Sequence, residues 1–121
     1  MLTLPKLKKK AWRLYSIKRR QAEADFQDHV VCYTCDKRLP WKEAHLGHFK
    51  HHKVDFDPRN TRIQCTGCNT FRDGRLDVYA LRLIREIGLE EVEDLERKAA
   101  QFKGYSRKEL EEIIKLSTAP Y

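Results

Sequence analysis

Four cysteines in two Cys-x-x-Cys pairs constrain the fold of this chain more than any other feature of its sequence. The pairs are Cys32 with Cys35 and Cys65 with Cys68, and the 29 residues between them hold four of the five histidines. Each pair is a short loop that lets two thiolates reach one ion, and four thiolates complete the closed tetrahedral shell preferred by structural Zn²⁺. Two disulfides would be disfavoured in a reducing cytoplasm. We therefore expect a zinc ion that stabilises the fold, with any reaction chemistry lying outside its closed shell.

The length of the chain, 121 residues, is that of about one domain, in which a metal ion would supply much of the cooperativity of folding. No segment approaches the ~20 consecutive apolar residues needed to cross a bilayer. Lysines and arginines also interrupt every apolar stretch near the amino terminus that could act as a secretory signal. We expect one domain, residues 1–121, in the cytoplasm.

Positive charge is concentrated at the amino terminus. Residues 1–20 contain eight lysines and arginines and no acid, whereas residues 21–121 contain 17 basic and 18 acidic residues. A basic arm on a near-neutral body is typical of proteins that bind nucleic acids, because neutralised phosphates release counterions. Trp12 and Tyr15 lie among these charges and could stack on bases or pack in the core. A solubilising helix and binding to an anionic membrane surface are the less favoured alternatives.

Hydrophobic periodicity predicts how the elements are ordered. Residues 6–27 have the three- and four-residue spacing of an amphipathic basic helix. Residues 30–88 should form the zinc-stapled core, in which a cysteine knuckle leads to a strand near residues 43–49, a polar loop, a return strand and a helix that begins near Asn69. Residues 89–117 should form two further helices, the second capped by Ser106 and Glu109. Their many acids fit a solvated face.

A histidine strand, a long loop, a return strand and a helix in this order resemble the HNH endonuclease superfamily. The matching residues are Gly47-His48-Phe49, Asn60, the run Gln64-Cys65-x-x-Cys68-Asn69, and Tyr79 with Gly88 downstream. The chain is most similar to the phage NinG (Rap) recombination nucleases, and His-Leu-Gly-His at 45–48 is also similar to the endonuclease VII group. The resemblance implies an α+β fold, in which a small ββα-metal (HNH, treble-clef-like) core is flanked by an N-terminal basic helix and C-terminal helices.

The chemistry of phosphodiester hydrolysis suggests roles for these residues. A neutral imidazole, with an unperturbed pKa of ~6.5, can take a proton from an attacking water, which makes His48 the candidate general base. A catalytic Mg²⁺ or Mn²⁺ would need oxygen ligands. Asn69 and Asp73 are four residues apart and would share one face of the predicted helix. The resemblance implies that Asn60 orients the loop, and many superfamily members carry a metal ligand where this chain has Gly47.

His45 is a further candidate ligand for the catalytic metal, and other sequence features leave alternatives open. A histidine such as His48 can be a buried structural residue, Asn69 a helix cap and Asp73 an ordinary surface acid. The residues expected to contact DNA phosphates are those of the basic arm and of the loop after His48: Lys8, Lys9, Lys10, Arg13, Lys18, Arg19, Arg20, Lys50, His51, His52 and Lys53.

These observations predict a metal-dependent DNA endonuclease. By resemblance, it would be encoded by a phage or prophage, act in the cytoplasm of the bacterial host, and cut branched or partly single-stranded DNA during recombination. Recombination proteins and a second copy of the chain are possible partners. The main alternative is a non-catalytic zinc-knuckle protein that binds nucleic acid. A third is a protein–protein adaptor that uses the acidic C-terminal helices.

Overall fold

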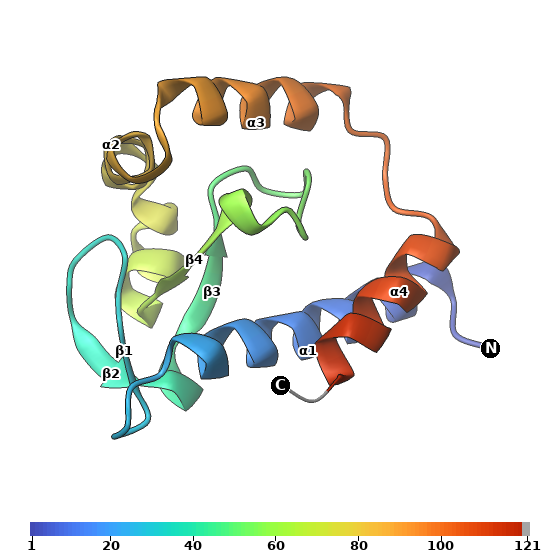
Figure 1. Cartoon of the computed structure of the whole chain (residues 1–121), viewed down its shortest axis with the longest axis horizontal. Coiled ribbons are helices and arrows are strands. Elements are labelled where there is room, and N and C mark those ends of the chain that lie inside the picture. The colour runs from blue at the N-terminus through green and yellow to red at the C-terminus, as the bar shows by residue number, and fades with distance from the viewer. Residues whose placement is uncertain (120–121) are drawn as a thin grey trace.

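The computed structural model describes residues 1–119, which form four α-helices and two antiparallel strand pairs (Figure 1). In chain order the elements are α1 (Leu4–Glu23), β1 (His29–Val31), β2 (Arg38–Pro40), β3 (His45–His48), β4 (Thr61–Gln64), α2 (Leu76–Ile87), α3 (Leu89–Gln101) and α4 (Arg107–Thr118). The α+β class predicted from the sequence is confirmed. No helix within the described residues is both long enough and apolar enough to span a membrane.

Helix α1 crosses the molecule beside α4 (Figure 1) and also contacts β3. Leu7 and Ala11 are buried in a cluster with Phe56 and Leu110. The helix starts two residues earlier and ends four residues earlier than the predicted range 6–27. It ends because an Asp25 carboxylate oxygen accepts hydrogen bonds from two backbone N–H groups beyond it, at 2.8 and 3.0 Å, which folds a turn in place of another helical turn.

Strands β3 and β4 form the antiparallel pair that positions the candidate site. His45 pairs with Gln64 and Gly47 with Arg62, so these residues lie on one face of the pair. His48 is the last residue of β3 and belongs to the opposite face. The second pair, β1 with β2, is the hairpin that carries the first two cysteines in its turn.

The segment between the second cysteine pair and α2 differs from the single helix predicted from Asn69 onward. A π-helical turn spans Gly67–Phe71, a 3₁₀ turn spans Asp73–Arg75, and α2 begins only at Leu76. Asp73, Gly74 and Arg75 all have positive φ, between 46° and 84°. A right-handed helix cannot pass through three such residues. Asn69 and Asp73 therefore do not share a helix face, and that premise for pairing them as ligands is wrong.

The C-terminal helices follow the prediction closely. Val92, Leu95 and Ala99 of α3 pack with Tyr79 and Leu83 of α2 in one buried cluster. Helix α4 begins with the predicted capping box, in which the Ser106 hydroxyl accepts from the Glu109 N–H and the Glu109 carboxylate accepts from the Ser106 N–H. Helix α3 lies on the opposite side of the β3–β4 pair from α1, whereas α4 lies beside α1 (Figure 1).

Candidate metal centre and nuclease site

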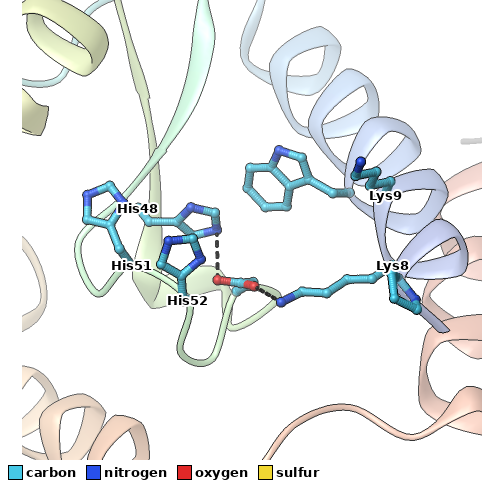
Figure 2. A pocket seen from close by; sticks show the side chains of 8 residues that line it. Lys8, Lys9, His48, His51 and His52 are labelled. Carbon is cyan, nitrogen blue, oxygen red and sulfur yellow. Dashed lines mark ion pairs between the residues drawn. The ribbon is translucent and has the colours of Figure 1, made fainter.

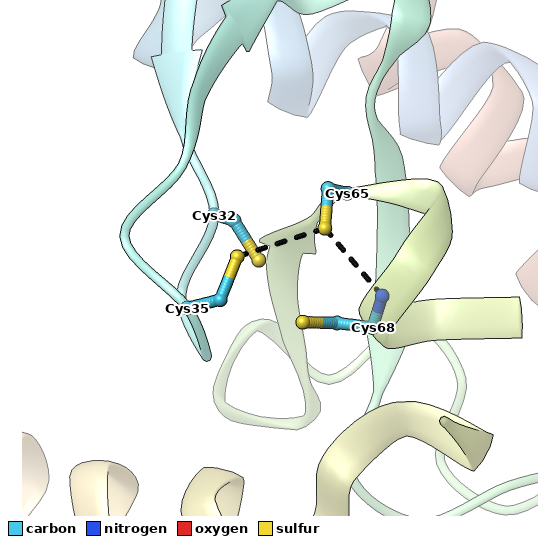
Figure 3. Close-up of side chains that lie close together, drawn as sticks. All are labelled: Cys32, Cys35, Cys65 and Cys68. Atoms are coloured by element: carbon cyan, nitrogen blue, oxygen red, sulfur yellow. Dashed lines mark hydrogen bonds between the residues drawn. The ribbon is translucent and has the colours of Figure 1, made fainter. Parts of the chain in front are cut away.

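The four cysteine thiols converge between the β1–β2 hairpin and the turn after β4 (Figure 3). All four sulfurs lie within 4.8 Å of one another, and Cys35 Sγ lies 3.7 Å from Cys65 Sγ. Four ligands at a Zn–S distance of about 2.3 Å would stand about 3.8 Å apart in a tetrahedron. The donor set and its spacing therefore fit a structural zinc ion.

The thiols differ in how readily they ionise without a metal. Burial raises the pKa of Cys35 to about 12. Burial also opposes ionisation of Cys32, but backbone N–H groups and the Thr34 hydroxyl hydrogen-bond its sulfur and lower the pKa of Cys32 to about 6. A bound cation would favour all four thiolates.

His48 lies at the end of β3 (Figure 2), and its ring contacts the indole of Trp12 in α1. The two rings are stacked with their centroids 4.3 Å apart, and 17% of the His48 side chain is exposed. His48 Nε2 stands 3.4 Å from Asp55 Oδ1, and Asp55 Oδ2 accepts from Lys8 Nζ at 2.8 Å. Neither His48 Nε2 nor Asp55 Oδ1 has a hydrogen-bond partner at normal distance. The imidazole thus faces a buried carboxylate across a slightly long gap.

The electrostatic surroundings of His48 favour its neutral form. Burial of the ring lowers the pKa of His48 below its usual value, and His51 and Lys8 act in the same direction. The Asp55 carboxylate opposes them, because it stabilises the protonated ring. A neutral imidazole at pH 7 can accept a proton, as a general base must.

A cavity of about 470 Å³ lies in front of His48 and is lined mainly by basic side chains. Lys8, Lys9, His51 and His52 surround it together with Pro5, Trp12 and Asp55 (Figure 2). The sequence predicted the basic residues but not Asp55, because no spacing distinguishes this acid within an irregular loop. Its burial beside His48 is the signal that only the fold provides.

Asn60 does not face this cavity but holds the loop that leads to Asp55. Its side chain is fully buried. Oδ1 accepts from the Lys50 N–H at 2.7 Å, and Nδ2 faces the carbonyls of Lys50, Lys53 and Val54 at 3.0 to 3.3 Å. These contacts connect the end of β3 to the far side of the loop, which suits the positioning role implied for Asn60.

Asn69 lies on the other face of β3 from His48. Its Nδ2 donates to His45 Nδ1 at 2.9 Å, and His45 Nε2 is 3.3 Å from the Thr66 hydroxyl. Asn69 and His45 line a second cavity of about 330 Å³, which also includes Arg20. The two cavities share Trp12, whose indole lies between the His48 and Asn69 sides. Asp73 lies at the start of the kink and is exposed.

The basic residues of α1 divide into two groups. Three of them donate hydrogen bonds within the protein. Lys18 donates to the carbonyls of Leu116 and Ala119, on the α4 side. Arg19 donates to Tyr15 and Thr61, and Arg20 donates to Ser16, Trp41 and Ala44. The hydrogen bonds of these three side chains hold α1 against the rest of the protein. Lys9, Lys10 and Arg13 are exposed. The exposed group is better placed than the engaged group to meet an external phosphate.

The basic residues of the loop after β3 also differ from one another. Lys50 pairs with Glu96 of α3 at 3.0 Å. His51, His52 and Lys53 are exposed, and both histidines line the cavity in front of His48. The predicted phosphate contacts of the loop therefore gather on the His48 side of β3.

The fold and site define a small α+β protein with a four-cysteine centre of zinc geometry and a basic cavity around a buried histidine. Residues 7–120 match the family model described as the bacteriophage lambda NinG protein, so the chain belongs to the NinG family, which is associated with phage recombination. This confirms the resemblance to NinG proteins drawn from the sequence. Comparisons with curated proteins and with solved structures gave no significant match.

Proposed function

We propose that this protein is an HNH-type, metal-dependent endonuclease that hydrolyses phosphodiester bonds in branched or partly single-stranded DNA during phage recombination. The observation that carries the proposal is His48, a neutral imidazole at a strand end that faces a buried carboxylate and a cavity lined by two lysines and two further histidines. Membership of a recombination-associated phage family supplies the context. The HNH assignment rests on the order histidine strand, loop, return strand and Asn69, which the fold preserves.

His48 performs the proton transfer in this proposal. A water oxygen attacks phosphorus, His48 takes the proton from that water, and the bond from phosphorus to the 3′ oxygen breaks as the leaving oxygen takes a proton from solvent water; His48 later returns its proton to solvent. Asp55 holds the ring and stabilises the imidazolium that forms, because its carboxylate lies 3.4 Å from Nε2 and is itself fixed by Lys8. Lys9 lies where it can neutralise the phosphate, and His51 and His52 lie where they can hydrogen-bond to it.

The divalent cation belongs on the Asn69 side of β3. Bound Mg²⁺ or Mn²⁺ would supply a Lewis acid for the phosphate and the leaving oxygen. Asn69 offers an amide oxygen there, and His45 orients that amide by accepting from its nitrogen. Both ring nitrogens of His45 are engaged, so we assign His45 to orientation and Asn69 to the cation. Asp73 is exposed and begins the kink at residues 73–75, so it shares no helix face with Asn69, and we leave it out of the proposed ligand set.

Trp12 must move for both halves of the site to act on one phosphate. Its indole lines both cavities and covers His48. Trp12 belongs to the basic helix, so engagement of α1 by DNA would act directly on this residue. We therefore include displacement of Trp12 in the proposal, with a base or sugar as a natural replacement for the indole.

A cleavage assay tests the proposal. Zinc-loaded protein is incubated with linear, nicked, displaced-loop and four-way DNA, with and without Mg²⁺ or Mn²⁺. We expect cleavage that requires the added metal and is lost in His48→Ala, while DNA binding persists in a mobility-shift assay. His29→Ala is the matched control, because His29 lies on β1 away from the cavity. Binding without cleavage in the unmodified protein would favour the zinc-knuckle alternative. Sedimentation of the DNA complex would show whether two copies act together.

A further inference from the structure

Gly47 precedes His48, at the position where many HNH proteins carry a metal ligand. In this protein the side chain of Gln64, on the neighbouring strand β4, lies at that position. In the β3–β4 register, Gln64 pairs with His45 and shares its face with Gly47. A Cβ atom built on Gly47 would overlap the Gln64 amide oxygen and stand 3.1 Å from Asn69 Oδ1. The Gln64 oxygen therefore occupies the space that a side chain at Gly47 would take, and the Asn69 oxygen lies at the edge of that space.

Hydrogen bonds fix the direction of the Gln64 amide. Its Nε2 donates to the Gly74 carbonyl at 2.7 Å and to the Thr34 hydroxyl at 3.1 Å. A carbonyl oxygen only accepts, so the amide nitrogen must face Gly74 and the amide oxygen must face Gly47. The partner of the Asn69 amide is the His45 ring, whose Nδ1 accepts in one tautomer and donates in the other, so Asn69 presents its oxygen to Gly47 when His45 Nδ1 carries no proton. The Gln64 oxygen cannot be exchanged for its nitrogen without breaking the bond to Gly74.

The Gln64 oxygen has no hydrogen-bond partner although its side chain is fully buried. A buried acceptor left without a partner costs about 1–3 kcal/mol and is rare in folded proteins. Here the unpartnered oxygen and the Asn69 oxygen both lie near the Cβ position of Gly47, so two acceptors share one region. A cation would resolve both features.

Neutral ligands are also what the rest of the site requires. Among the described residues, the cysteines are the sole group of three or more His, Cys, Asp and Glu side chains close enough to hold one metal ion. A catalytic cation must then use amide oxygens, water and the DNA phosphate. Mg²⁺ tolerates such a set, since it keeps several waters and takes few protein ligands.

Building on the proposed function, we infer that Gln64 Oε1 and Asn69 Oδ1 together form the protein's half of the divalent cation site. Gln64 replaces the ligand that Gly47 cannot offer. Gly47 is required because any side chain there would displace the Gln64 oxygen. The DNA phosphate supplies the negative charge that two amides lack, so the cation is held firmly only in the DNA complex.

Paramagnetic broadening by Mn²⁺ detects such a weak site without relying on catalysis. Mn²⁺ is titrated into zinc-loaded, ¹⁵N-labelled full-length protein, and the side-chain amide signals of Gln64 and Asn69 are followed with the exposed Gln101 as the internal control. We expect the Gln64 and Asn69 signals to broaden first. Broadening that spares Gln64 and begins at His51 and His52 would overturn the inference.

A variant tests the same point independently. Gln64→Met keeps the length of the side chain and removes the oxygen, so we expect the Mn²⁺ concentration that half-broadens Asn69 to rise at least about fivefold, a decrease of about 1 kcal/mol in binding. Gln101→Met should leave that concentration unchanged. An unchanged value in folded Gln64→Met, checked by its zinc content, would refute the ligand role. If Gln64→Met does not fold, the titration of the unmodified protein decides.

The two proposals fail separately. Broadening at Gln64 in a protein that cuts no DNA would support the cation site and refute the nuclease. Metal-dependent cleavage without broadening at Gln64 would support the nuclease and refute this ligand.

Discussion

Replacing Asn60 by alanine tests whether this residue holds the loop between β3 and β4. The side chain is fully buried and connects to four backbone groups: the N–H of Lys50 and the carbonyls of Lys50, Lys53 and Val54. Alanine leaves three of these groups without their partner, because the Val54 carbonyl still accepts from the Asp57 N–H at 3.0 Å.

The contacts set the expected size of the effect. A buried polar group without its partner costs about 1–3 kcal/mol, and the groups of Lys50 and Lys53 are near enough to solvent for water to offset part of that cost. We therefore expect Asn60→Ala to lower the free energy of unfolding by about 3–4 kcal/mol. For a chain of this size, this corresponds to a drop of about 12–16 °C in melting temperature.

Urea unfolding with excess zinc measures the change. Asn69→Ala is the matched control, because Asn69 is half-buried and makes one side-chain contact, with His45, and should be destabilised by less than about 1 kcal/mol. The reasoning is refuted if Asn60→Ala is no less stable than Asn69→Ala. It is also refuted if Asn60→Ala is destabilised by less than about 1.5 kcal/mol, since three backbone groups without their partner cannot cost so little while the loop keeps its structure.

Three further perturbations follow from the structure. Removing zinc with a strong chelator should unfold the strand core, because the binding free energy of structural zinc, about 10–16 kcal/mol, contributes directly to the stability of the fold. An unchanged circular dichroism spectrum would contradict this. Cleavage should fall at acid pH as His48 is protonated, with an apparent pKa below ~6.5. Asp55→Asn removes the charge that raises the pKa of His48, so the pH at which cleavage falls should decrease. An increase in that pH would contradict the geometry. Changing Lys9, Lys10 and Arg13 to alanine should weaken DNA binding about equally for all sequences. The slope of the logarithm of the binding constant against the logarithm of the salt concentration should fall in magnitude by about 0.9 for each phosphate that the variant no longer neutralises. An unchanged slope would exclude a role for these residues in phosphate binding.

The parts of the fold that were predictable from sequence depend on local chemistry. The two cysteine pairs have the spacing of a metal knuckle whatever surrounds them, and their sulfurs do converge. The capping box of α4 needs only Ser106 and Glu109, which are three residues apart. The order of helices and strands follows from hydrophobic periodicity, which is also local.

The parts that were not predictable depend on contacts between distant segments. The helix predicted from Asn69 breaks at residues 73–75, where Gly74 accepts a hydrogen bond from Gln64 of β4. Asp55 lies in an irregular loop, and its place beside His48 depends on the hydrogen bonds that Asn60 makes across that loop. Hydrophobic periodicity along the sequence does not indicate which distant residues form such hydrogen bonds.

Trp12 illustrates the same limit for the site. The sequence suggested two roles for this residue, stacking on bases and packing in the core. The structure places its indole on His48 and between two cavities. The packing of α1 against β3 decides this position, and no pattern within α1 indicates it.

The most direct test of the central claim is the single-turnover rate at which four variants cut four-way DNA in Mg²⁺: the unmodified protein, His48→Ala, Asn69→Ala and the double variant. If both residues act on one phosphate, each single change should lower the rate at least about 100-fold, and the double change should lower it little further, since groups that act as a unit are not additive. Cleavage by His48→Ala or by Asn69→Ala at the rate of the unmodified protein would contradict the account.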